Sequence, residues 1–196
     1  ASVKYHKILN QDYGKSLDDN FSNLTQVDVA VLVYNFVDML SHARTDMDVI
    51  KELATDESAY RSITKSWFEH SHLLEVLKKI AAYGGDLVIT TDHGSVKTNN
   101  PVKIVGDKST NTNLRYKVGR NLSYNEKEVF VIKNPEEAHL PKANLTSSYV
   151  FALKQDYFVY PNNYNQYVKM YMDTFPHGGV SPEEMLVPYV NLVPKK

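Results

Sequence analysis

Hydrophobic residues are spread unevenly along the chain, and the first long run of them predicts a central strand. Residues 27–40, VDVAVLVYNFVDML, are mostly apolar and rich in β-branched and aromatic side chains. A run of this kind is typical of a strand that is buried on both faces. Asp38 and His42 lie at the end of this run or just past it.

Two helices are predicted after this strand. From residue 45 to residue 64 the pattern is polar, with apolar residues at helical spacing. A better marked helix is predicted over residues 67–83. Ser66 and Glu69 form a capping-box signature for it, and two glycines at 84–85 end it.

The segment 86–91, DLVITT, is a short β-rich run that follows the second helix. Strand, helix and strand therefore alternate, as in an α/β fold whose mostly parallel sheet is flanked by helices. Asp92, His93 and Gly94 come directly after this strand. In open α/β sheets the carboxyl ends of the strands form the edge that binds ligands.

After this motif the pattern predicts a loop-rich inserted subdomain, from about residue 97 to residue 160. The sequence there is rich in Asn, Lys and Thr, with short extended runs at 129–133 and 148–151. The tyrosines from Tyr157 to Tyr171 could stack on bases, but at this density they are expected to cover a subdomain or an interface. Residues 184–193, EMLVPYVNLV, predict a final strand.

The composition narrows the kinds of function. Lysines and arginines number 22 against 23 aspartates and glutamates, so the net charge of −1 gives no overall attraction to nucleic acid or membrane. The chain has no cysteine, which excludes disulfides and thiolate metal sites. It also lacks a bilayer-spanning apolar stretch and the apolar core of a signal peptide, so we expect a soluble, cytoplasmic protein without a membrane partner.

Five residues of metal-binding types occur in three short motifs. They are Asp38 and His42, the adjacent Asp92 and His93, and the late His177. Zinc binds His nitrogens and carboxylate oxygens, and about three protein donors leave a position open for water or substrate. The spacing puts Asp38 and His42 on one side of a helical turn, whereas only tertiary structure can bring His177 to them. Taken singly, each motif is also explained by loop carboxylates and by capping or core histidines.

Taken together, these motifs resemble a known family. The order Asp-x-x-x-His, then TTDHGS at residues 90–95, then FPHGGVSPEEMLVP at residues 175–188 is similar to the C-terminal half of a PglZ-type domain of the alkaline phosphatase superfamily. Further segments, SWFEHSHLLEVLKKI, TNLRYKVGRNL and FVYPNNYNQY, resemble the PorX-type response regulators of Bacteroidetes, whose C-terminal portion is a PglZ domain. The resemblance covers essentially the whole chain.

The resemblance implies a zinc-dependent phosphoric ester hydrolase with two zinc ions. It implies that Asp38, His42 and His177 bind one ion. Asp92 and His93 would bind the other, together with an earlier Asp and a nucleophilic Thr or Ser. The implied substrates are phosphate esters, with nucleotide-like phosphodiesters as candidates. The resemblance further implies fusion to a two-component receiver domain and a link to the regulation of protein secretion, of the type IX kind.

The residues that the family places before the first motif have no counterpart here. Ser22 and Thr25 are the only hydroxyls close upstream of the predicted central strand, and both lie in a polar turn. The chain is therefore expected to be a fragment that lacks its nucleophile and is inactive by itself, with the missing N-terminal part of the same protein as its partner. Loss of N-terminal strands would expose a sheet edge, so a homodimer is a candidate assembly.

Residues 97–120 concentrate positive charge. They contain six basic residues against one acid, Asp107, which gives a charge of +5 directly after the Asp-His-Gly motif. Arg115 and Arg120 have planar guanidinium groups suited to bidentate phosphate contacts, and Lys117 lies between them. These three are the predicted substrate-binding residues, although a solvated hairpin with basic side chains explains the same pattern.

A second class of function stays open from the sequence. The chain could be a non-catalytic signalling or interaction module that keeps a metal ion for folding. The set of five donors argues against this alternative, because a pure binding module has no need of open metal positions.

Overall fold

The chain forms two compact units. One comprises residues 1–89 and 189–196, and the other comprises residues 90–188. The computed structural model describes residues 1–142, 144 and 146–195, without the side chain of residue 46. In sequence the second unit interrupts the first, and the insertion predicted from about residue 97 to residue 160 lies inside this second unit.

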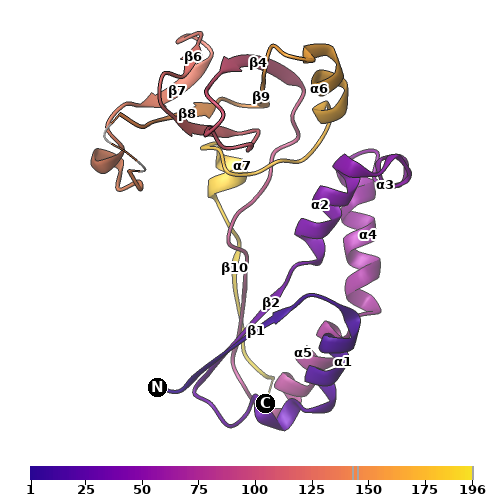
Figure 1. Cartoon of the computed structure of the whole chain (residues 1–196). Coiled ribbons are helices and arrows are strands. Elements are labelled where there is room, and N and C mark those ends of the chain that lie inside the picture. The colour runs from indigo at the N-terminus through magenta and orange to yellow at the C-terminus, as the bar shows by residue number, and fades with distance from the viewer. Residues whose placement is uncertain (143, 145, 196) are drawn as a thin grey trace. The chain divides into compact units, whose positions relative to one another are not determined.

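The first unit consists of helices and short strands that pair two by two. Its elements in chain order are β1 (Val3–Ile8), α1 (Gln11–Asp19), the 3-10 helix η1 (Phe21–Asn23), β2 (Val29–Tyr34), α2 (Phe36–Asp46), α3 (Asp48–Leu53), α4 (Glu57–Glu69), α5 (His72–Tyr83), β3 (Leu87–Thr90) and β10 (Tyr189–Leu192). β1 and β2 are parallel, with Val3 opposite Val29, and β3 pairs with β10 (Figure 1). Helices α1 and α5 pack together, and their core is formed by Ile8, Leu17, Leu24 and Val76.

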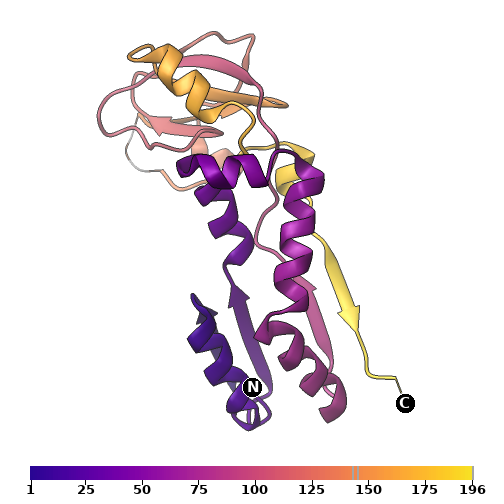
Figure 2. The ribbon, with the colours of Figure 1, turned by 90° about the vertical axis from the view of Figure 1, so that its right-hand side faces the viewer.

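The predicted central strand is shorter than expected and is not buried on both faces. β2 ends at Tyr34 and the chain continues directly into α2 (Figure 2). Among the described side chains of α2, Leu40 and Arg44 are buried, and their spacing of one helical turn suits a helix. Val29 and Val31 remain 48% and 38% exposed, because helices cover only the face of β2 that carries Leu32 and Tyr34.

The helix boundaries differ from the predicted ones between residues 66 and 72. Ser66 lies inside α4, and α5 begins only at His72, so the predicted capping box at Ser66 and Glu69 is wrong. The side chain of Asp56 caps α4 instead, since it accepts a hydrogen bond from the backbone N–H of Ala59 (2.8 Å). The predicted stop is confirmed, because Gly84 adopts a left-handed conformation (φ 87°) at the end of α5.

The second unit contains most of the strands. Its elements in chain order are β4 (Asn100–Val105), β5 (Tyr116–Gly119), β6 (Ser123–Tyr124), β7 (Val129–Ile132), the 3-10 helix η2 (Pro135–Ala138), β8 (Ser148–Ala152), β9 (Asp156–Val159), α6 (Tyr164–Tyr171) and α7 (Pro182–Met185). The extended runs predicted at 129–133 and 148–151 correspond to β7 and β8. The predicted strand at 184–193 is only partly present, because its first residues belong to α7.

The expectation of a mostly parallel sheet is not confirmed. In the second unit, β4 pairs parallel with β9 but antiparallel with β6, and β8 pairs antiparallel with both β5 and β7. The fold is therefore mixed α/β with several small sheets. Val102, Ile104, Val150 and Phe158 lie at the centre of the hydrophobic core between these strands.

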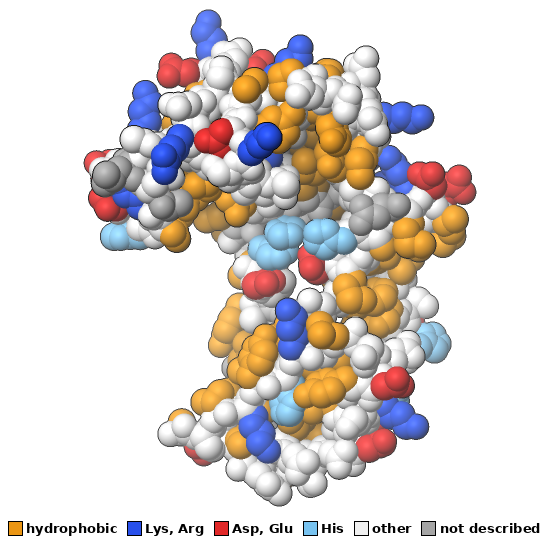
Figure 3. Space-filling view, viewed as in Figure 1, with side chains coloured by type: hydrophobic (Ala, Val, Ile, Leu, Met, Phe, Trp, Pro, Cys, Tyr) orange, Lys and Arg blue, Asp and Glu red, His pale blue; other side chains and the backbone are white. Residues whose placement is uncertain are grey.

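Hydrophobic side chains are not confined to the cores. Figure 3 shows many of them at the surface, and in the first unit Val3, Tyr5 and Tyr189 are 62%, 62% and 74% exposed. Among the described residues, no helix is both long enough and apolar enough to cross a membrane.

Candidate metal centre

Helix α2 presents the first pair of predicted metal ligands. Asp38 lies in its first turn and His42 one turn later, so both project from the same side of the helix. The Nε2 atom of His42 lies 3.5 Å from an Oδ atom of Asp38, and the two side chains are 68% and 39% exposed. An acidic residue in the first turn is also favoured by the partial positive charge of a helix N-terminus.

The second pair lies in the Asp-His-Gly loop (residues 92–94), directly after β3. The Nε2 atom of His93 is 3.7 Å from the carboxylate of Asp92, and Asp92 is 88% exposed. The Nδ1 atom of His93 lies 3.0 Å from the carbonyl oxygen of Gly94. Since a carbonyl oxygen can only accept a hydrogen bond, Nδ1 carries the ring proton and donates the hydrogen bond. Nε2 is then the ring nitrogen that can bind a metal.

The His-Gly-Gly loop (residues 177–179) brings the last predicted ligand beside His93. The imidazole rings of His93 and His177 stack within the second unit, with centroids 3.8 Å apart and planes 12° apart. The carbonyl of His177 accepts a hydrogen bond from the side-chain amide of Asn113 (3.1 Å). Gly178 has φ 100°, a conformation that favours glycine and lets the chain turn sharply behind His177.

Both loops are anchored to Glu184 in α7. The backbone N–H of Gly94 donates to the carbonyl of Glu184 (2.9 Å), and the backbone N–H of Gly179 donates to its carboxylate (2.8 Å). Ser181 caps α7 in a capping box with Glu184, and its hydroxyl donates to the same carboxylate (2.9 Å). The main chain of one residue and its side chain thus hold the two histidine loops.

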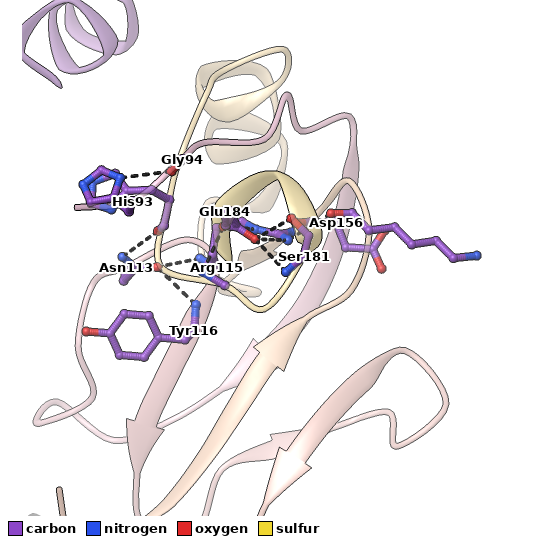
Figure 4. Close-up of polar contacts among 11 residues, drawn as sticks. His93, Gly94, Asn113, Arg115, Tyr116, Asp156, Ser181 and Glu184 are labelled. Atoms are coloured by element: carbon purple, nitrogen blue, oxygen red, sulfur yellow. Dashed lines mark hydrogen bonds and ion pairs between the residues drawn. The ribbon is translucent and has the colours of Figure 1, made fainter. Parts of the chain in front are cut away.

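Arg115 completes this arrangement from the other side. Its Nε and Nη2 atoms donate to the two oxygens of Glu184 at 2.9 and 2.8 Å, and both side chains are almost fully buried (Figure 4). Its Nη1 atom donates to the carbonyl of Asp156, and Nη2 also donates to the carbonyl of Lys154. Burial raises the pKa of Glu184, but the hydrogen bonds and charge of Arg115 outweigh it and leave this pKa below its usual value.

The predicted substrate-binding residues fall into two groups. Arg115 and Lys117 are 0% and 1% exposed, and their burial argues against direct contact with a substrate. The Nζ atom of Lys117 donates to the carbonyl of Asn111 (2.9 Å) and lies over the ring of Tyr160. Burial lowers the pKa of Lys117 to about 8. Arg120 is exposed, and its role in substrate binding stays a prediction.

The basic segment 97–120 does not form one continuous cationic surface. Lys97 pairs with Asp173 (3.1 Å), and Lys103 lies over the ring of Tyr164. Alternation along β5 turns Lys117 inward. The number of charges in the sequence does not predict this outcome, because it does not indicate which charged side chains become buried in the fold.

The two histidine–carboxylate pairs fit a zinc ligand set. Two ligands that bind a tetrahedral zinc ion at about 2.1 Å lie about 3.4 Å apart. The His42–Asp38 and His93–Asp92 separations of 3.5 and 3.7 Å are close to this value. Nitrogen and carboxylate oxygen are donors that zinc accepts. Each pair could therefore supply two of the three or more protein donors that a zinc-like ion needs.

The anchor residues of this site were not predicted. The sequence does contain a signal for two of them. Ser181 and Glu184 form the S-x-x-E pattern of a capping box, which stands before a hydrophobic stretch. The partner Arg115 could not be inferred in the same way, because it lies 69 residues away along the chain.

A known protein family matches nearly the whole chain. Residues 1–192 match a model for an alkaline phosphatase-like domain, a class of phosphoric ester hydrolases that usually bind metal ions. The model is that of the BREX system PglZ alkaline phosphatase-like domain, and the chain belongs to this family. No curated protein matches the chain.

Proposed function

We propose that the chain is the metal-binding part of a zinc-dependent phosphatase or phosphodiesterase. Asp38, His42 and His177 would bind one ion, and Asp92 and His93 would form part of a second site. The observation that carries this proposal is the pair of imidazole–carboxylate separations, 3.5 and 3.7 Å, on motifs of a PglZ-type domain. The grouping of His177 with the α2 pair rests on the likeness of the motifs to the superfamily.

The roles of the chain's own residues follow from their contacts. The hydrogen bond from Nδ1 of His93 to the Gly94 carbonyl holds the ring so that Nε2 is available. Asp38 and Asp92 would supply negative charge, which favours a divalent cation. When bound, zinc would stabilise charge on phosphoryl oxygens and lower the pKa of an attacking hydroxyl. We assign no residue of the chain as the nucleophile, and propose that a longer protein supplies it.

The finer features of the proposal come from the further likeness to PorX-type proteins. We propose a nucleotide-like phosphodiester as the substrate, with exposed Arg120 as a contact to its phosphate. The longer protein would join this domain to a two-component receiver domain, act in the cytoplasm and take part in regulating protein secretion. A homodimer is its proposed assembly.

A generic phosphodiester reporter tests the proposal on the longer protein. Bis(p-nitrophenyl) phosphate should be cleaved in the presence of zinc, cleavage should stop after chelation, and added zinc should restore it. Asp92→Asn should lose this activity, because it removes one charge of the second site without changing its shape. Cleavage that survives both chelation and Asp92→Asn would contradict the proposal.

The non-catalytic alternative has one observation in its favour. Val3, Tyr5 and Tyr189 expose large hydrophobic side chains in the first unit, as a partner-binding module would. Under this alternative the longer protein would bind zinc and gain thermal stability from it, but would not cleave the reporter. The chelation assay therefore separates the two functions.

A further inference from the structure

Glu184 has a position in the second unit that stability alone does not explain. Its carbonyl binds the Asp-His-Gly loop and its carboxylate binds the His-Gly-Gly loop, so a single residue touches both segments that carry candidate metal ligands. We propose that the buried Arg115–Glu184 pair is a positioning device that holds His93 and His177 in register for metal binding. The inference deepens the proposed metal site, and its metal-affinity arm rests on that proposed function.

The hydrogen bonds to the carboxylate define its position closely. It accepts from the backbone N–H of Gly179 at 2.8 Å and from Ser181 through both the backbone N–H (3.2 Å) and the hydroxyl (2.9 Å). Arg115 adds two parallel bonds, the bidentate geometry of a guanidinium and a carboxylate. With this many donors around it, the carboxylate has little freedom to move, and the His-Gly-Gly loop is fixed with it.

The guanidinium group is itself tied to the sheet frame of the second unit. Arg115 donates to the carbonyls of Lys154 and Asp156, which lie at the turn from β8 into β9. The carbonyl of Arg115 in turn accepts from the backbone N–H of Ala152 in β8 (2.8 Å). The histidine loops are thereby connected through Glu184 and Arg115 to the strands that form the core.

The glycines of both loops show how closely the parts fit. A Cβ atom on Gly94 would overlap the carbonyl oxygen of Glu183, and one on Gly179 would lie 2.5 Å from the Glu184 carboxylate. His93 directly precedes Gly94, and His177 stands two residues before Gly179. The close approach of each glycine to α7 therefore sets where its neighbouring histidine lies, and the rings meet at 3.8 Å.

A purely stabilising role would be met more simply by hydrophobic side chains. Replacing a buried ion pair with well-packed apolar residues is often neutral or stabilising. An apolar pair could not accept the backbone N–H of Gly179 or the hydroxyl of Ser181, so it would leave the His-Gly-Gly loop unanchored. The chemistry at residues 115 and 184 matches what is needed to hold this loop.

Gly94→Ala is the first test, with Gly14→Ala as the matched control. At Gly14 an added Cβ would meet its nearest atoms at 3.6 and 3.7 Å, which is ordinary contact, so the control adds the same methyl group without displacement. In the metal-free protein, NMR should show upfield ring-proton shifts for His93 and His177, because each ring lies over the face of the other. Gly94→Ala should abolish these shifts and weaken zinc binding about 10- to 100-fold, while Gly14→Ala changes neither.

Glu184→Gln is the second variant, since it keeps the shape and removes the charge that Arg115 and the His-Gly-Gly loop share. Methyl resonances of Val150 and Ala152 report whether the core of the second unit remains folded. Loss of the histidine shifts with these core signals retained, in both variants, supports the positioning role. Retained shifts and unchanged zinc affinity in either variant would overturn it, as would loss of the core signals in both variants.

The two arms also separate this inference from the proposed function. If the unaltered protein binds no zinc but Gly94→Ala and Glu184→Gln both abolish the ring shifts, the proposed metal site fails while the positioning of the histidines stands. If zinc binds and the shifts survive in Gly94→Ala, the proposed function stands and the positioning role fails.

Discussion

His93 and His177, 84 positions apart along the chain, lie with their imidazole rings face to face at 3.8 Å in the second unit. Stacking covers the ring faces, whereas the nitrogens lie at the ring edges, outside the stack. A metal ion binds imidazole in the plane of the ring, at such an edge. The stacked pair is therefore compatible with zinc binding, and it gives the candidate site a spectroscopic signature.

His93→Ala should weaken zinc binding by the chain, because it removes the nitrogen that faces the Asp92 carboxylate. We expect a loss of at least about 10-fold in affinity, measured by competition with a chromophoric chelator. His139→Ala is the matched control, since His139 ends η2 in the same unit and has no place in the proposed site. Equal affinity of the two variants would contradict the assignment of His93.

Arg115→Met should strongly destabilise the second unit. It leaves the carboxylate of Glu184 buried without its cation, which typically costs about 3–5 kcal/mol in the free energy of unfolding. Lys97→Met breaks the exposed pair with Asp173 and should cost only about 0–1 kcal/mol. Urea unfolding followed by far-ultraviolet circular dichroism measures both, and similar losses in the two variants would refute the distinction.

Lys117 should make stability depend on pH in the alkaline range. Burial lowers its pKa from 10.5 to about 8, so between these values the unfolded state binds more protons than the folded state. The contribution of Lys117 to the free energy of unfolding should therefore be lowest below pH 8 and rise toward pH 10.5, by about 3 kcal/mol in total.

Lys117→Met, which is similar in length but uncharged, isolates this effect. Its stability advantage over the unaltered protein should be largest near pH 7 and shrink as the pH rises. Other tyrosines, such as Tyr34 and Tyr157, also have raised pKa values, but both proteins contain them and the difference cancels their contribution. A stability difference between the two proteins that stays constant from pH 7 to pH 10 would show that folding does not lower the pKa of Lys117.

The chain by itself should not turn over a phosphodiester, even with zinc in excess, because under the proposed function a longer protein supplies the nucleophile. Release of p-nitrophenolate from bis(p-nitrophenyl) phosphate measures this directly. Asp92→Asn serves as the control for contaminating activity. Zinc-dependent release that Asp92→Asn abolishes would place a nucleophile within the 196 residues and contradict the expectation.

Local sequence patterns predicted several elements correctly. They failed where the same segment was compatible with both a strand and a helix. The strand at 86–91 and the end of α5 at Gly84 were correctly predicted, because a β-rich run and a glycine act locally. The run 27–40 was read as one strand, yet its second half is helical. The β-branched and aromatic residues of this run favour a strand. In the structure, however, residues 36–46 form α2, and Leu40 and Arg44 are buried one helical turn apart.

The sequence alone determined the donor types, their motif spacing and the likeness to PglZ-type domains, because these depend only on which residues follow one another. Tertiary structure alone decided that Arg115 is buried as an internal partner of Glu184, and that His93 stacks on His177. The reason is physical: burial and long-range pairing depend on residues far apart in the chain, and a charged side chain reads the same in sequence whether it faces solvent or a buried carboxylate.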